Sequence, residues 1–144
     1  MNTPVPAVGD TLPPLTLSFT REALVRYAGA STDFNPIHYS DHAATSLGLP
    51  GVVAHGMLTM GAALRIVTDW CGDPAAVRSY AARFSKPVPV PDDGIGARVE
   101  VTGTVSAVGD AADGTPLVTV QLTARCGDEV VLRGASVEVV WGMA

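Results

Sequence analysis

The 144-residue sequence has few aromatic residues, few charged residues and only two cysteines. Nine lysines and arginines stand against fourteen aspartates and glutamates, so the formal net charge is −5 at pH 7. The basic residues form no run, and an acidic chain without a basic patch is poorly suited to nucleic acids or anionic membranes. We therefore expect neither a nucleic acid nor a membrane as the partner.

Cys71 and Cys126 lie far apart and fit no CxxC or zinc-binding pattern. Two reduced cysteines in a cytoplasmic protein are the simplest interpretation, because disulfides persist mainly in oxidising compartments. The first nine residues lack a cationic segment before an apolar run, so they do not predict a signal peptide. The longest apolar stretch meets Arg65 and Asp69 too early to span a bilayer.

The length fits one domain, which we expect to cover residues 1–144. A domain of this size buries roughly 68 to 70% of the surface of its unfolded chain. It therefore needs neither a disulfide nor a metal to hold a core together.

Asp33 and His38 are the residue types that proton transfer uses. On an α-helix, two residues five apart would diverge by about 140° around the axis. They converge only in irregular backbone, which Pro36 and the turn-forming side chains of Asp33 and Asn35 favour. The sequence thus predicts a tight turn that holds an acid beside an imidazole, and the alternative is an ordinary loop with an incidental histidine.

Residues 55–70 are apolar on nearly every face until Arg65 and Asp69, which predicts a long central helix buried all round. The helix would be about 24 Å long. The free N–H of Gly56 at its start and the helix dipole favour an oxygen that gains negative charge. His55 either lines this site or is a structural hydrogen-bonding residue.

A metal site is an alternative for part of this segment, because His38 and His42 are four residues apart. However, Ser40 has the character of a helix N-cap, and a helix that begins after it leaves His38 outside. No third ligand is evident in the sequence. We expect no metal, and His42 is most simply a solvated helix residue.

The rest of the chain predicts an α+β fold. A strand over 15–19 precedes two helices. The first covers 21–30 and is capped by Thr20, and the second covers 41–47. After residue 74, alternating apolar and polar residues predict antiparallel strands joined by turns, four in all with the last strand. A curved five-stranded antiparallel sheet wrapped around the long apolar helix would bury that helix. Its open edge favours a dimer. The alternating segments are 80–85, 99–105 and 118–125, with turns at 109–116 and 127–128. A last strand covers about 129–141, with a bend at Gly134.

The motif DFNPIH at residues 33–38, followed by AHGML at 54–58, resembles the signature of the MaoC-like dehydratases, which include the (R)-specific enoyl-CoA hydratases. The resemblance runs from residue 8 to the final strand. Within the family the chain looks most like the B subunit of the (3R)-hydroxyacyl-ACP dehydratase of mycolic acid synthesis, through residues 56–61, 72–74 and 87–91.

This resemblance implies a hotdog fold and (R)-specific hydration or dehydration of acyl thioesters on coenzyme A (CoA) or acyl carrier protein (ACP), without a cofactor. Asp33 and His38 would be the catalytic acid/base pair, and the Gly56 N–H would hold the thioester oxygen. Asn35 would shape the loop with Pro36. Several members carry a serine where this chain has Leu64, which affects the surroundings of the aspartate.

The resemblance also implies a homodimer or a heterodimer with a related hotdog subunit, in which the chain that carries the pair is catalytic. Two alternatives remain open: a hotdog thioesterase, which uses a carboxylate elsewhere, and a non-catalytic acyl-binding or stabilising subunit. Arg78, Arg83 and Lys86 either meet the phosphates of the carrier or lie on a solvated strand face.

Overall fold

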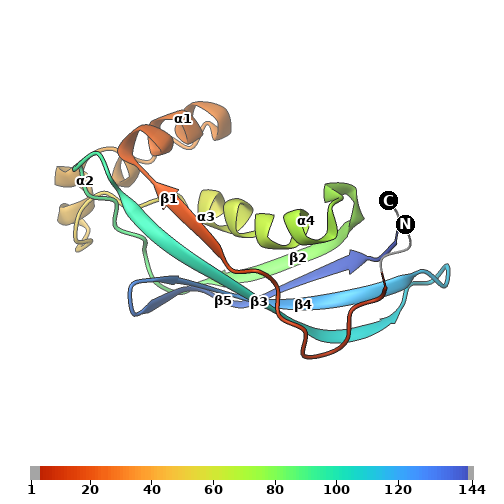
Figure 1. Cartoon of the computed structure of the whole chain (residues 1–144). Coiled ribbons are helices and arrows are strands. Elements are labelled where there is room, and N and C mark those ends of the chain that lie inside the picture. Colours follow the sequence, from red (N-terminus) through yellow and green to blue (C-terminus); the bar gives the residue numbers. More distant parts are fainter. Residues whose placement is uncertain (1–3, 143–144) are drawn as a thin grey trace.

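The computed structural model describes residues 4–142, and five strands form one curved antiparallel sheet in it (Figure 1). The helices lie on one side of this sheet. β1 and β2 are the two edges. Across the sheet the order is β1 (Leu15–Phe19), β3 (Ala97–Asp110), β4 (Pro116–Cys126), β5 (Glu129–Val140) and β2 (Val77–Phe84).

The predicted alternation of apolar residues builds the core face of the sheet. On β3, every second residue from Ala97 to Val105 is buried and the residues between are exposed. Val118, Val120 and Leu122 of β4 are buried in the same way. These side chains cover the sheet face that packs against the central helices, so period-two alternation was a reliable signal here.

Two of the predicted irregularities are confirmed, and one loop is shorter than predicted. Gly134 has φ +55, and the β2–β5 register shifts beside it, which is a bulge that bends β5. Gly127 and Asp128 form the turn between β4 and β5. The polar connection between β3 and β4 covers only residues 111–115, because the two strands stay paired up to Asp110.

The central helix differs from the prediction of one continuous helix. It consists of α3 (Gly56–Ala63) and α4 (Arg65–Cys71), which meet at Leu64. The N–H of Val67 donates to Leu64 O, three residues back, at 2.9 Å, which tightens the backbone locally. The hydroxyl of Tyr80 donates to Met60 O at 2.9 Å, and this carbonyl is also the acceptor of the long 3.3 Å bond from Leu64 N–H.

The central helix is also not buried all round. Met57, Gly61, Arg65 and Asp69 recur at intervals of four residues and form an exposed stripe. The opposite side is buried against the sheet through Ala63 and its neighbours. Some of the residues that led to this prediction are therefore exposed to solvent in the single chain.

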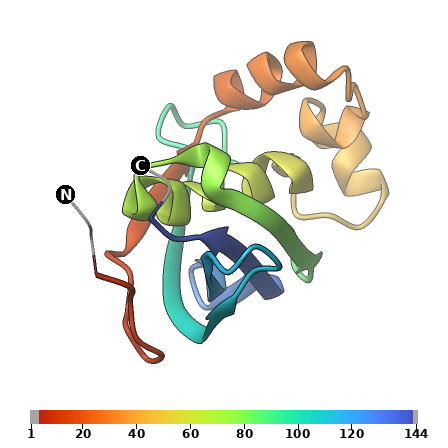
Figure 2. The same cartoon turned by 90° about the vertical axis from the view of Figure 1, so that its right-hand side faces the viewer.

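Two further helices stand beyond the start of α3, on the side of the molecule away from β4 and β5 (Figures 1 and 2). They are α1 (Arg21–Ser31) and α2 (Asp41–Ser46), and the short 3₁₀ segment η1 (Pro36–His38) lies between them. Thr20 and Ser40 cap them as predicted, because each hydroxyl accepts the N–H three residues on. A second 3₁₀ segment, η2 (Pro74–Ala76), leads into β2.

Cys71 and Cys126 are both free thiols. Within residues 4–142, none of the helices is long and apolar enough to cross a membrane.

Candidate active site

The turn after α1 is built from backbone bonds to its own side chains. Thr32 ends the helix in the left-handed region, with φ 61, and turns the chain away from the helix axis. Asp33 Oδ1 then accepts the N–H of Asn35 at 3.2 Å, and Asn35 Oδ1 accepts the N–H of Ile37 at 3.2 Å. These two side-chain turns give the irregular backbone that the spacing of the motif requires.

The turn brings His38 beside Asp33, as the sequence predicts. The His38 side chain is buried, and its Nδ1 lies 2.7 Å from Val53 O, so Nδ1 is the donor and carries the proton. Its Nε2 faces Asp33 Oδ2 at 3.8 Å. That separation is longer than a direct hydrogen bond and is compatible with a shared water or substrate oxygen. The Asp33 side chain is half exposed.

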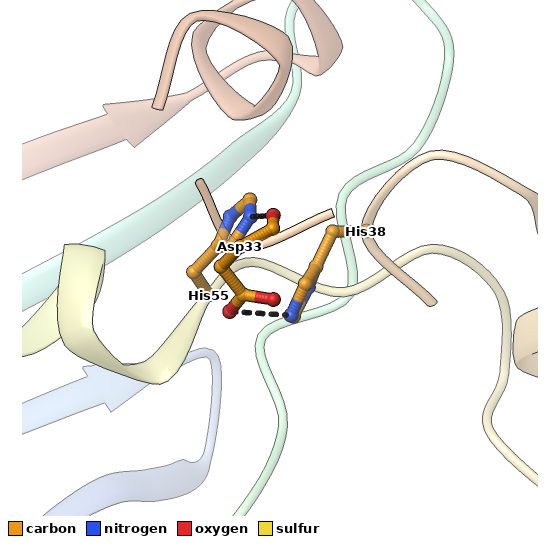
Figure 3. A group of neighbouring side chains, drawn as sticks. All are labelled: Asp33, His38 and His55. Atoms are coloured by element: carbon orange, nitrogen blue, oxygen red, sulfur yellow. Dashed lines mark hydrogen bonds and ion pairs between the residues drawn. The ribbon is translucent and has the colours of Figure 1, made fainter. Parts of the chain in front are cut away.

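His55 completes the group (Figure 3). It is 1% exposed, and its Nε2 lies 3.2 Å from the backbone oxygen of Asp33. Its ring stacks on that of His38 with centroids 3.8 Å apart and 23° between the planes. Burial lowers the pKa of His55, against a smaller opposing effect of the Asp33 hydrogen bond. His55 therefore packs behind the pair as a hydrogen-bonding residue, the second of the two sequence-based alternatives.

Gly56 begins α3, and the first N–H groups of a helix have no partner within it. The side chain of His55, at the N-cap position, makes no capping bond to them. A Cβ on Gly56 would lie 3.1 to 3.2 Å from ring atoms of Phe84, so the glycine allows this ring to approach the start of the helix.

Asp33, His38 and Gly56 all line one cavity of about 460 Å³. The cavity has a mainly apolar wall, and Lys86 lies on it, whereas Arg78 and Arg83 do not. Sequence reasoning missed Phe84 and Thr59, because their place in the cavity depends on how β2 and α3 pack together. The other lining residues are Ile37, Leu49, Val53, Ala54, Met57, Ser85, Pro87, Val88, Val131 and Leu132.

The same cluster offers three potential metal ligands, because side-chain atoms of Asp33, His38 and His55 all lie within 4.8 Å of one another. His42, the residue considered from the sequence, is not part of it. A coordinated metal lies in the plane of each imidazole at about 2.0 to 2.1 Å. Two rings stacked 3.8 Å apart and tilted by only 23° have planes that meet much farther away. The arrangement therefore does not fit coordination by both histidines.

The sequence of this chain is similar to those of known proteins. A family model described as "MaoC like domain" matches residues 5–123. The 3-hydroxyacyl-thioester dehydratase X of Mycobacterium tuberculosis is 42% identical over 90 residues, which cover 61% of this chain and 31% of that protein. The chain thus spans about a third of the length of this relative.

Two solved structures share the architecture. One, described as a MaoC-like dehydratase, matches with a TM-score of 0.87 and 38% identity, over 94% of this chain and 40% of that one. The other, the ChsH1-ChsH2 complex from Mycobacterium tuberculosis, matches with a TM-score of 0.79 and 28% identity, over 95% of this chain and 99% of that one. They confirm the predicted hotdog fold. Both sequence motifs fall within the matched residues, and the chain belongs to the MaoC-like dehydratase family.

Proposed function

We propose that residues 1–144 form one hotdog domain that hydrates trans-2-enoyl thioesters to (3R)-hydroxyacyl thioesters and catalyses the reverse dehydration. One observation carries this proposal: Asp33, His38 and Gly56, the first residue of α3, line a single cavity with a mainly apolar wall. An acid/base pair, an oxyanion donor and a wall for an acyl chain are the parts that this hydro-lyase reaction needs. The names of the relatives, a dehydratase above all, support the same class.

In the proposed mechanism, a water lies between Asp33 Oδ2 and His38 Nε2. The Nδ1–H of His38 is bound to Val53 O, which leaves the Nε2 lone pair directed at the carboxylate side. The oxygen of the water bonds to C3, and the proton that the water loses passes through the pair to C2. The pair therefore ends each turnover in its starting protonation state, and in dehydration the same transfers run backwards.

The thioester oxygen gains negative charge while C3 is attacked. We place it against the N–H of Gly56, where the helix dipole favours an anion and no side chain caps the donor. This arrangement needs no metal or redox cofactor. Lys86 lies on the cavity and is suited to a phosphate of the carrier, which is CoA or the phosphopantetheine of ACP.

The partner that we propose is a second hotdog subunit, either identical or related. Two cavity residues lie on surfaces that the single chain leaves uncovered. Met57 belongs to the exposed stripe on α3 and α4, Phe84 belongs to the edge strand β2, and they are 60% and 54% exposed. One of the similar structures is itself a complex of two named chains. The two free cysteines support the cytoplasmic location expected from the sequence.

The test is to incubate the purified chain, alone and with candidate hotdog partners, with trans-2-enoyl-CoA and to identify the products. We expect loss of the conjugated double bond and a (3R)-hydroxyacyl product. Release of free CoA thiol with an intact double bond would contradict the proposal and favour the thioesterase. Binding of the thioester without turnover in every combination would favour the non-catalytic subunit.

A further inference from the structure

His55 touches both members of the proposed pair without lining the cavity. We propose that His55 is a positioning residue, whose Nε2–H fixes the backbone of Asp33 while its ring fixes the plane of the His38 imidazole. This inference rests on the proposed function. It adds a role for a residue that takes no part in the proton transfers described above.

The first argument is that Asp33, at the start of the turn, makes few other bonds. The N–H of Asp33 donates to Ser31 Oγ at 3.2 Å, and its carboxylate accepts from Asn35, and both of these bonds lie within the turn itself. The bond from His55 Nε2 to Asp33 O joins residues 22 positions apart. It therefore ties Asp33 itself to the start of α3, whereas the far end of the turn is held separately by the bond from Val53 N–H to Ile37 O at 3.1 Å.

The second argument concerns the orientation of the His38 ring. The bond from Nδ1 to Val53 O fixes one atom of this ring but allows the plane to rotate about that contact. The stacked ring of His55, 3.8 Å away, removes this freedom. Tyr27 in turn holds His55 edge-on, with ring centroids 4.7 Å apart. Catalytic geometry is sensitive to such constraints, because a displacement of about 1 Å can cost about 10²-fold in rate.

The third argument is that the His55 side chain makes these contacts but no capping hydrogen bond to α3. It occupies the N-cap position of α3, where Ser, Thr, Asp or Asn stabilises a helix more than residues that do not cap. The side chain turns instead toward the Asp33 turn, and Nδ1 remains a buried atom without a hydrogen-bond partner among the described residues. Stabilisation of α3 therefore does not explain a histidine at this position, whereas positioning of Asp33 and His38 does.

The decisive variants separate the two ring nitrogens. In His55→Gln the amide nitrogen can take the place of Nε2 and donate to Asp33 O, and the planar amide can lie against the His38 ring in place of the imidazole. The shorter side chain of His55→Asn reaches only the position of Nδ1. His55→Phe keeps an aromatic ring for the stack but has no donor. We expect kcat within about 10-fold of the wild type for Gln, and a loss of about 10²-fold for Asn and Phe, with little change in KM.

Thermal melts and circular dichroism of the variants identify any that do not fold. A role in stability alone would lower the melting temperature and leave kcat per folded molecule unchanged. Wild-type kcat in folded His55→Asn or His55→Phe would overturn the proposal. So would a His55→Gln variant that is as slow as His55→Asn.

Two further measurements need no activity and so separate this inference from the proposed function. Nitrogen-15 NMR of the wild type should show the neutral ring of His55 with its proton on Nε2, and a proton on Nδ1 would overturn the inference. In crystal structures, Asp33 should keep its distance from His38 in His55→Gln and move by about 1 Å or more in His55→Phe. An unmoved Asp33 in His55→Phe would also overturn it.

Discussion

Gly56, which lines the cavity, meets two requirements at once: a backbone N–H at the first position of α3 that no side chain caps, and the absence of a Cβ beside Phe84. The two requirements can be separated by substitution. Proline is favoured at the first position of a helix, and the extended backbone of His55, at φ −61 and ψ 131, suits the residue before a proline. Gly56→Pro thus removes the proposed oxyanion donor and preserves the helix.

We expect Gly56→Pro to lower kcat by about 10² to 10³-fold, the usual effect of losing one such donor. Gly56→Ala is the matched control, because it introduces the same contact with Phe84 and retains the N–H. Its kcat should stay within about 10-fold of the wild type, a margin well inside the loss expected for a donor. Equal losses in both variants would show that the contact with Phe84 matters and that the N–H does not.

At the same scale, the sequence predicted the pairing of Asp33 with His38 and the free N–H of Gly56. The pairing was predictable because local turn chemistry positions Asp33 and His38: Asn35 and Pro36 set the path of the backbone between them. The bond from His55 to Asp33 O depends on a contact across 22 residues, which no local pattern encodes. For this reason the sequence left two alternatives open for His55.

At the scale of elements, Tyr80 links β2 to the point where the central helix divides. Its hydroxyl donates to Met60 O at 2.9 Å, and burial raises the pKa of Tyr80 to about 12. The sequence did not predict the division at Leu64, because this bond comes from a strand that is distant in the chain. Apolar composition likewise did not reveal the exposed stripe on α3 and α4.

We expect Tyr80→Phe to lower the free energy of unfolding by about 1 kcal/mol at neutral pH, the usual net value of one hydrogen bond. Since the pKa of Tyr80 is higher in the folded state, the wild type should lose stability as the pH rises above about 10, and the variant should lose less. Urea melts at pH 7 and 11 measure both effects. The exposed Tyr39 supplies the control, Tyr39→Phe. A gap between Tyr80→Phe and wild type that does not narrow at pH 11 would contradict this account.

Asp41, the first residue of α2, links this helix to α1 and to the backbone at Val52. Its carboxylate accepts the N–H of Val52 at 2.9 Å and pairs with Arg21 of α1 at 2.9 Å. These contacts lower the pKa of Asp41 below 3.8, and the bond from Val52 has the larger effect. Because the pKa is lower in the folded state, ionised Asp41 stabilises the fold above about pH 3.8 and loses this effect as the pH falls through the folded value.

Asp41→Asn should therefore unfold at a lower urea concentration than the wild type at pH 6, and the difference should fade below pH 3.8. The control is Glu22→Gln, which breaks an exposed pair with Arg26 and should change little at either pH. A difference between Asp41→Asn and wild type that is the same at pH 6 and pH 2.5 would show that the charge of Asp41 is not the cause.

At the scale of the whole molecule, alternation and turn signals predicted the strands and the turns that join β3, β4 and β5. They predicted neither the places of β1 and β2 at the two edges nor the surfaces that we propose face a partner. The edge of β2, Met57 and Phe84 are exposed beside the cavity. We expect light scattering of the active species to give at least twice the mass of one chain, with itself or with a related subunit. A monomer with full activity at nanomolar concentration would contradict the proposed partner.

The most direct test of the central claim is the rate of (3R)-hydroxyacyl thioester formation by the wild type beside His38→Ala and Asp33→Asn, each in its active assembly. The account predicts that both variants fold and that each loses about 10² to 10⁴-fold in kcat, the range that general acid/base groups contribute. Turnover at the wild-type rate in both folded variants would contradict the assignment of Asp33 and His38 as the catalytic pair.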